Sequence, residues 1–132
     1  RYTQVEVQRC LPIQMLMKYF KEEGDKWRIN EDLRKMVTYQ YFNLLDNMQT
    51  LGQFDVIFCR NVLIYFDEDT KRKVLENMAG ILKPDGFIVL GGAETVLGIT
   101  DKYKPLTNQR GIYILSSNTQ HEAAQQVAQT GA

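Results

Sequence analysis

The pattern of apolar and polar positions predicts one central strand with a polar pair directly after it. The apolar run Phe54–Cys59 holds β-branched and aromatic residues and a single charge. Such a run is typical of a strand buried on both faces in a parallel sheet. Arg60 and Asn61 follow at once, before the apolar residues resume. In open α/β sheets ligands bind beyond the carboxyl ends of the strands, so we expect this pair to belong to a binding site.

The next segment predicts a helix and a second strand. A helix is expected over residues 69–82, capped by Asp67 or by Asp69-Thr70. Lys-Pro-Asp-Gly at 83–86 should end it in a turn, because proline cannot continue a helix and glycine supplies a positive φ. Residues 87–90 then form a second buried strand, and the strand-helix-strand order calls for a parallel pair. The apolar stripe of the helix is Val74, Leu75, Met78, Ile81 and Leu82.

The N-terminal third predicts smaller elements. Helical periodicity runs through residues 7–20, with Pro12 in the first turn of the main helix. Residues 26–29 and 37–42 favour strands, and an Asn-capped helical turn lies between them. Residues 26–42 would therefore form a small strand–turn–strand projection. Its exposed edge could add a partner peptide as a further strand, or could pair only within its own protein.

The C-terminal third predicts a hairpin and a tail. Residues 103–106 and 111–116 are joined by so few residues that they should pair antiparallel. The Gln-, Ala- and Thr-rich residues 117–132 favour a disordered tail or a linker. His121, the only histidine, lies in that tail, and we interpret it as a solvated bystander.

Composition narrows the class of protein. Of the 132 residues, 16 are basic and 16 acidic, so the net charge argues against nucleic acid or an anionic membrane as partner. No run of about 18 apolar residues is present, which excludes a transmembrane helix. Cys10 and Cys59 lie far apart without metal-binding spacing. We therefore expect reduced thiols, a cytoplasmic location and no metal site.

Several blocks of sequence then occur in a distinctive order. They are EVQRCLP at 6–12, MKYF at 17–20, Asn43-Leu44-Leu45-Asp46, FDVIFCRNVLIYFD at 54–67 and Leu-Lys-Pro-Asp-Gly at 82–86. Together they resemble the chemotaxis receptor methyltransferase (CheR-type) family, over about residues 2–116. The RNVLIYF block is the most specific of them, and Cys10 stands where that family usually has glycine.

The resemblance implies a fold and an activity. The fold would be α/β, the C-terminal half of a Rossmann-like methyltransferase sheet that ends in an antiparallel hairpin. Residues 1–116 would be part of the catalytic domain, with 26–42 as a small inserted antiparallel β-subdomain. The family transfers a methyl group from S-adenosylmethionine to glutamate side chains of chemoreceptor cytoplasmic domains. In some members the β-subdomain docks the receptor's C-terminal peptide.

The resemblance also implies site residues. Asn43, Leu44, Arg60 and Asn61 match the family's cofactor contacts, and Tyr65 matches the tyrosine beside the transferred methyl group. Other roles for these residues remain open on the sequence. Asn61 could fix a loop, Arg60 could form a structural ion pair, and Tyr65 could simply pack. Glu94 could face the site or cap a helix, and the sequence does not decide between these two roles.

The chain departs from the family pattern at its start. The first strand, the glycine-rich loop and the acidic ribose ligand would precede residue 1, and no G-x-G loop lies before Phe54. We therefore expect an interior start, no activity for the chain alone, and self-association through an open sheet edge. Two alternatives stay open. One is a non-catalytic docking module that binds a receptor peptide through 26–42, and the other is a methyltransferase of this fold with another substrate.

Overall fold

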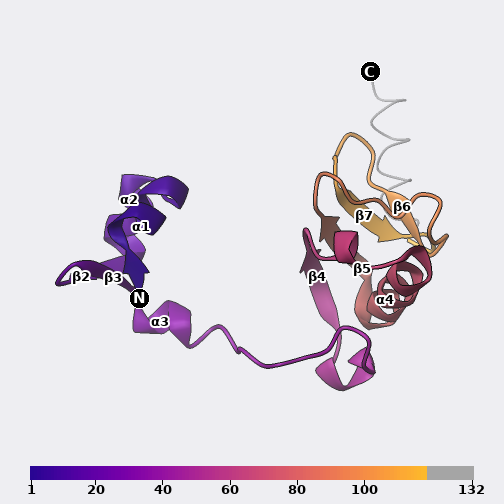
Figure 1. Ribbon diagram of the computed structural model, residues 1–132, viewed down its shortest axis with the longest axis horizontal. Coiled ribbons are helices and arrows are strands. Elements are labelled where there is room, and N and C mark those ends of the chain that lie inside the picture. The colour runs from indigo at the N-terminus through magenta and orange to yellow at the C-terminus, as the bar shows by residue number, and fades with distance from the viewer. Residues whose placement is uncertain (119–132) are drawn as a thin grey trace. The chain divides into compact units, whose positions relative to one another are not determined.

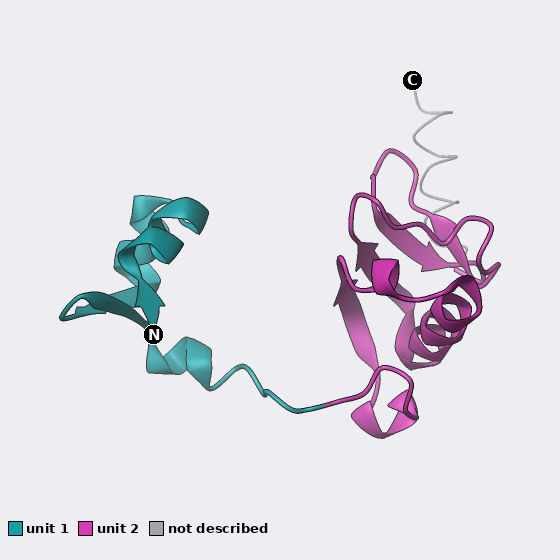
Figure 2. Ribbon diagram, in the orientation of Figure 1, with its two compact units in different colours: residues 1–41 teal, residues 42–132 magenta. Residues whose placement is uncertain are grey.

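The computed structural model describes residues 1–118, which form two compact units that divide between Tyr41 and Phe42 (Figure 2). The predicted tail lies outside the described residues from residue 119 onward, as does His121. Within the described part, no helix combines the length and the apolar character that crossing a membrane requires.

Unit 1, residues 1–41, contains three short helices and a three-stranded antiparallel sheet (Figure 1). The sheet has the strand order β1-β3-β2, so β3 is the central strand and β1 and β2 are its edges. The elements are β1 Tyr2–Thr3, α1 Gln4–Cys10, α2 Ile13–Tyr19, β2 Phe20–Glu23, β3 Lys26–Ile29 and α3 Glu31–Arg34.

The helical periodicity of residues 7–20 corresponds to two helices, α1 and α2, on either side of Pro12. The Pro12 carbonyl accepts the first bond of α2, from the N–H of Leu16 at 3.1 Å. Proline has no N–H of its own to continue the hydrogen bonds of α1, so the two helices cannot be one. The prediction that Pro12 begins a helix is confirmed, and a separate short helix, α1, precedes it.

The strand predicted at 37–42 is also wrong. This segment has no regular secondary structure, and the side chains of Tyr39 and Tyr41 are exposed. The hairpin partner of β3 is β2 instead, across a turn at Gly24 with φ of 64°. Aromatic and β-branched residues favour a strand only where a neighbouring strand or a packed face receives them.

Unit 2, from residue 42 onward, contains the four-stranded mixed sheet β4-β5-β7-β6 and one long helix (Figure 1). β4 and β5 are parallel, as predicted, and β7 pairs antiparallel with both β5 and β6. The predicted C-terminal hairpin is thereby confirmed. The elements are η1 Met48–Leu51, β4 Phe54–Cys59, η2 Leu63–Tyr65, α4 Glu68–Ile81, β5 Leu82–Leu90, β6 Tyr103–Pro105 and β7 Ile112–Leu115, where η denotes a 3-10 helix.

The prediction for α4 is confirmed in both its cap and its buried face. The Asp67 side chain accepts a hydrogen bond from the backbone N–H of Thr70 at 2.8 Å, which begins the helix. The core of unit 2 forms where α4 packs against the sheet. All five residues of the predicted stripe are buried in that core: Val74, Leu75, Met78, Ile81 and Leu82.

The structure corrects the burial expected for the central strand. β4 has the predicted bounds, but it is an edge strand of the sheet rather than an interior one. The side chain of Phe58 is 74% exposed and that of Val56 is 43% exposed, whereas Cys59 is buried. One face of β4 therefore remains open in the described residues.

The turn predicted at 83–86 is a bulge within β5. The helix ends at Ile81, and the strand begins at Leu82, opposite Phe54. The next paired residue, Phe87, lies opposite Val56, so β5 advances five residues where β4 advances two. Gly86 is required here for a close approach, because an added Cβ would lie 2.8 Å from the carbonyl oxygen of Asp55.

Candidate functional site

The candidate site lies at the carboxyl ends of the parallel strands β4 and β5. Arg60 and Asn61 follow β4, and Gly91 and Gly92 follow β5. Because the strands are parallel and adjacent, these two segments leave the sheet at the same edge. This is the edge at which open α/β sheets bind ligands.

Glu94 joins the two segments. Its side chain is only 8% exposed, and both of its carboxylate oxygens accept hydrogen bonds from backbone N–H groups. Oε1 accepts from Asn61 at 2.6 Å and from Gly91 at 2.8 Å. Oε2 accepts from Leu63 at 2.7 Å and from Val62 at 3.2 Å. One carboxylate thus satisfies three consecutive donors after β4 and one donor after β5.

These donors keep the Glu94 carboxylate ionised. Burial alone raises the pKa of Glu94, because it disfavours the charged form. The hydrogen bonds from the four backbone N–H groups outweigh this effect, so the pKa of Glu94 lies below its ordinary value. The residue is therefore a carboxylate at neutral pH, and an acceptor rather than a proton donor.

The backbone of Asn61 is held in the left-handed region, with φ of 60°. Asparagine tolerates this conformation better than most residues because its short amide can bond locally. The conformation lets the N–H groups of Asn61, Val62 and Leu63 converge on one oxygen pair, as in the anion-binding nests of protein loops. Losing the acceptor would leave the buried N–H of Leu63 unsatisfied, at a cost of about 1–3 kcal/mol.

Gly91 is tightly enclosed at this junction. A Cβ added there would collide with the side-chain oxygen of Asn61 and would lie 2.6 Å from Glu94 Oε1. Its neighbour Gly92 has open space around the corresponding position. Only the first glycine of the pair is therefore required by the packing of the site.

An open pocket of about 700 Å³ borders the junction. Two guanidinium side chains, of Arg60 and Arg110, line it together with the glycine backbone after β5 and the start of β7. Within residues 1–118 neither guanidinium forms a hydrogen bond or an ion pair. The Glu94 carboxylate also lines the pocket, so two guanidinium groups without ion-pair partners share it with one anion that backbone N–H groups already bind.

The structure brings only part of the predicted site together. Arg60 and Asn61 lie at the junction, as predicted. Asn43, Leu44 and Tyr65 do not line the pocket beside them. Asn43 closes a local turn through its side-chain oxygen, which accepts from the N–H of Leu45 at 3.0 Å. Leu44 is half-buried against the core of unit 2, and Tyr65, in η2, is 80% exposed.

Cys59 is part of the core rather than of the chemistry. Burial, assisted by the negative charge of Glu94, raises the pKa of the Cys59 thiol to about 11. The group is therefore neutral at pH 7 and a poor nucleophile. Among residues 1–118 no cluster of His, Cys, Asp and Glu side chains could hold a metal ion.

Glu94 is the residue whose role the sequence left undecided. Its role depends on a contact with residues 61–63, which no local pattern encodes. One signal was available. An acidic residue close behind a glycine pair, at the end of a buried strand, has backbone N–H groups within reach.

Comparison with known proteins gives a consistent result. The model of the family described as "CheR methyltransferase, SAM binding domain" matches residues 1–112. A chemotaxis protein methyltransferase of Vibrio anguillarum is 42% identical over 95 residues, which are 71% of this chain and 34% of the relative. Two others match over 112 residues, 84% of this chain and 41% of the relative, at 37% identity in Vibrio parahaemolyticus and 38% in Pseudomonas putida. The chain spans between a third and two fifths of the length of these curated relatives.

Proposed function

The chain belongs to the CheR methyltransferase family, and from this premise we propose that it forms part of an enzyme that methylates glutamate side chains of chemoreceptor cytoplasmic domains. The matched region is the family's S-adenosylmethionine-binding domain, so the cofactor is S-adenosylmethionine. The mixed sheet with two parallel strands and a terminal hairpin fits the Rossmann-like methyltransferase fold. Such receptors present these glutamates in the cytoplasm, which is therefore the location we propose.

The observation that carries this proposal is the pair of unpartnered polar side chains after β4. Within residues 1–118 the guanidinium of Arg60 and the carboxamide of Asn61 donate no hydrogen bond. A guanidinium can bind a carboxylate through two parallel bonds, and a carboxamide can both donate and accept. These donors fit the amino-acid end of S-adenosylmethionine, which carries one carboxylate and one ammonium group.

The chemistry requires little of the protein beyond positioning. When bound, the cofactor supplies a methyl group on a positively charged sulfur. A glutamate side chain is already ionised near neutral pH, so no strong base has to activate it. The chain's task is to orient the two reactants and to exclude water. Arg60 and Asn61 would hold the cofactor, Asn43 and Leu44 would contact its adenosine end, and Tyr65 would place its hydroxyl beside the methyl group.

The test uses the full-length protein that contains this chain. Purified protein is incubated with methyl-labelled S-adenosylmethionine and receptor cytoplasmic fragments, and label in glutamate methyl esters is measured. Arg60→Ala and Asn61→Ala should each raise the Kd for the cofactor about tenfold or more in calorimetry. Arg9→Ala, an exposed arginine of α1, is the matched control and should bind normally. Label that appears on a small molecule instead of the receptor would contradict the proposed substrate.

We also propose that residues 1–132 alone do not catalyse this reaction. The sequence holds no glycine-rich loop before Phe54, and such a loop lets the backbone approach the cofactor. Calorimetry on the isolated chain should show no binding at micromolar S-adenosylmethionine. Tight binding would contradict this expectation.

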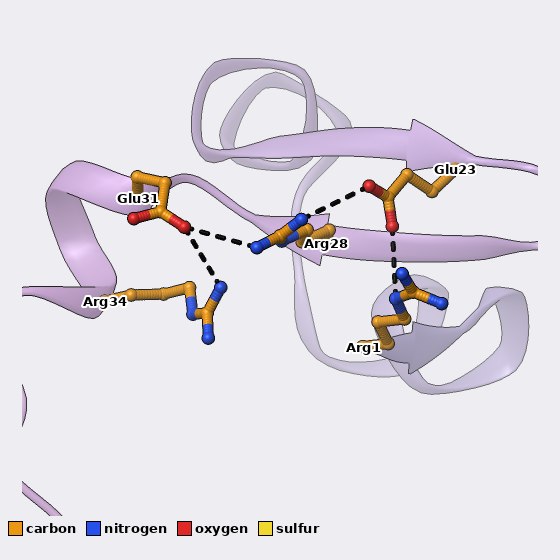
Figure 3. A network of polar contacts seen from close by, with 5 residues as sticks. All are labelled: Arg1, Glu23, Arg28, Glu31 and Arg34. Carbon is orange, nitrogen blue, oxygen red and sulfur yellow. Dashed lines mark hydrogen bonds and ion pairs between the residues drawn. The ribbon is translucent and has the colours of Figure 1, made fainter.

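Unit 1 favours a second role, the docking of a receptor peptide. Its ion pairs link Glu23 and Glu31 to three arginines, Arg1, Arg28 and Arg34, so positive charge is in excess (Figure 3). The same three guanidinium groups line a small pocket of about 210 Å³. An acidic peptide could lie there and add to an edge of the sheet. The hairpin that would receive it is β2–β3, at residues 20–29, rather than the 26–42 projection expected from the sequence.

The docking role can be separated from catalysis in the full-length protein. Arg28→Ala should weaken binding of a receptor C-terminal peptide in fluorescence anisotropy and leave S-adenosylmethionine affinity unchanged. If the peptide binds the variant as tightly as the wild type, the docking role is wrong.

A further inference from the structure

We propose that Glu94 is a positioning residue of the cofactor site, which acts by fixing the backbone from which the Asn61 side chain projects. The inference rests on the proposed function, because it assumes that Asn61 contacts the cofactor. Glu94 itself would touch neither the cofactor nor the substrate.

The first argument is the geometry of the carboxylate. Of the carboxylates in residues 1–118, that of Glu94 alone is buried, and every close partner it has is a backbone N–H group. Three of the four donors belong to the turn that carries the predicted cofactor contact. The shortest of the four bonds, 2.6 Å, ends on the nitrogen of Asn61 itself.

The second argument is the conformation that these bonds hold. Asn61 has a left-handed backbone, with φ of 60°, which asparagine tolerates better than most residues and which the bonds to Glu94 hold in place. Three consecutive N–H groups that converge on one point repel one another, because their hydrogens carry partial positive charge. An anion between them removes this repulsion. The carboxylate is that anion, so the direction in which the Asn61 side chain leaves the backbone depends on Glu94.

The third argument is the connection across the sheet edge. The same oxygen that binds Asn61 accepts from Gly91, at the end of the neighbouring strand. The Asn61 side-chain oxygen lies against Gly91 as well, within the space that a Cβ would need. The side-chain amide of Asn61 is thereby held by contacts with the ends of both strands, β4 and β5.

The simpler alternative is a purely structural role, in which Glu94 only fastens two loops. The two roles differ in how mutations combine. Suppose that Glu94 affects cofactor affinity only by positioning the Asn61 side chain. Once that side chain is removed, a second mutation at Glu94 should then cause little further loss of affinity. If it only stabilises the fold, the two losses of affinity are independent.

The test is a double-mutant cycle in the full-length protein, read out by calorimetric titration with S-adenosylmethionine. Glu94→Gln replaces one acceptor oxygen by an NH2 group that faces N–H donors. Asn61→Gly removes the side chain while tolerating the positive φ. We expect each single variant to raise the Kd about ten- to hundredfold. The Kd of the double variant should equal that of the single variant that binds S-adenosylmethionine more weakly. The proposal would be overturned if the two increases in Kd multiplied in the double variant. It would also be overturned if a folded Glu94→Gln protein had the wild-type Kd.

Controls keep the outcome interpretable. Glu68→Gln removes an exposed carboxylate at the start of α4 and should leave the Kd unchanged. Each variant is checked by near-UV circular dichroism and thermal melting. If Glu94→Gln does not fold, the same cycle is measured with Glu94→Asp, which keeps the charge but withdraws it from the turn. Wild-type protein that does not bind S-adenosylmethionine would refute the proposed function, whereas normal binding with additive losses would refute only the role of Glu94.

Discussion

Glu94 Oε1 lies 2.6 Å from the backbone nitrogen of Asn61, a residue 33 positions earlier in the chain. The contact joins the segment after β4 to the segment after β5 through a single atom, since the same oxygen also accepts from Gly91. A change on either side of this bond should therefore alter the other side.

Gly91 offers the most direct test of that relationship. Gly91→Ala leaves Glu94 chemically intact but places a methyl group 2.6 Å from its Oε1. We expect the free energy of unfolding to fall by about 1–3 kcal/mol, and the Kd for S-adenosylmethionine to rise. Gly92→Ala is the matched control, because open space surrounds that position. Urea unfolding and calorimetry of full-length variants check both results, and equal behaviour of the two variants would contradict the packing described here.

Gly86 should be intolerant for a different reason. Alanine there would place its Cβ 2.8 Å from the backbone oxygen of Asp55 and 2.7 Å from the Leu82 side chain. Because the backbone of paired strands can move little to relieve this overlap, Gly86→Ala should lower the midpoint of urea unfolding. Gly80→Ala, in α4, meets open space and should raise stability by up to about 1 kcal/mol. A stabilised Gly86→Ala protein would show that the bulge in β5 is wrongly described.

Glu94 should make stability depend on pH. Its folded pKa lies below the ordinary value of 4.5, so the folded state holds the proton less tightly than the unfolded state. The stabilisation is therefore complete above the unfolded pKa and is lost as the pH falls through the folded pKa. In urea unfolding from pH 7 to pH 3, the advantage of wild type over Glu94→Gln should shrink with acidification. A difference that grows toward low pH would reverse the sign and refute the assignment.

The two cysteines should differ in reactivity. Cys10 is exposed, whereas Cys59 is buried and burial raises its pKa to about 11. One thiol should therefore react quickly with a disulfide reagent at pH 7.5, and the second only after unfolding in denaturant. Cys10→Ser should remove the fast phase completely. A fast phase that persists in this variant would place Cys59 at the surface.

The open face of β4 should promote association of the isolated chain. Phe58 is 74% exposed on an edge strand, and its neighbours Val56 and Phe54 are partly exposed. Apolar edges of this kind pair with other edges. We expect light scattering to detect dimers or larger species at high micromolar concentration. Phe58→Lys should reduce them, and Ile13→Lys, equally exposed at 74% but on a helix, should not.

The sequence predicted unit 2 well because its elements carry strong local signals. β4 is an apolar run with one charge, Asp55, and α4 combines an Asp67 cap with a regular apolar stripe that ends at Ile81. The signals of α4 agree with the tertiary packing, which is what makes a local prediction succeed.

The errors have physical reasons. Residues 37–42 have the composition of a strand, but no neighbouring strand of the described residues receives them. The Lys-Pro-Asp-Gly segment has turn chemistry, yet it bulges within β5 because β4 holds the flanking residues in register. The prediction that β4 is buried on both faces was wrong. Its residues are apolar on both faces, but the described residues cover only one of them.

The candidate site was predicted in its position but not in its construction. Arg60 and Asn61 could be found from the sequence, since polar residues after a buried strand mark the ligand edge of a sheet. The support beneath them could not, because Glu94 reaches residues 61–63 only after β4 and β5 have paired. The cofactor contacts of Arg60, Asn61, Asn43 and Leu44 and the role of Tyr65 remain predictions from the resemblance.

The carboxylate of Glu94 also limits how this chain can be recombined with another sequence. A graft that replaces residues 91–94 would remove the acceptor of the backbone N–H groups of Asn61, Val62 and Leu63, although α4 and β5 separate the two segments. Because these donors belong to the backbone, residues 60–66 can be exchanged while Glu94 stays. Residues 91–94 can be exchanged only if a carboxylate returns to position 94.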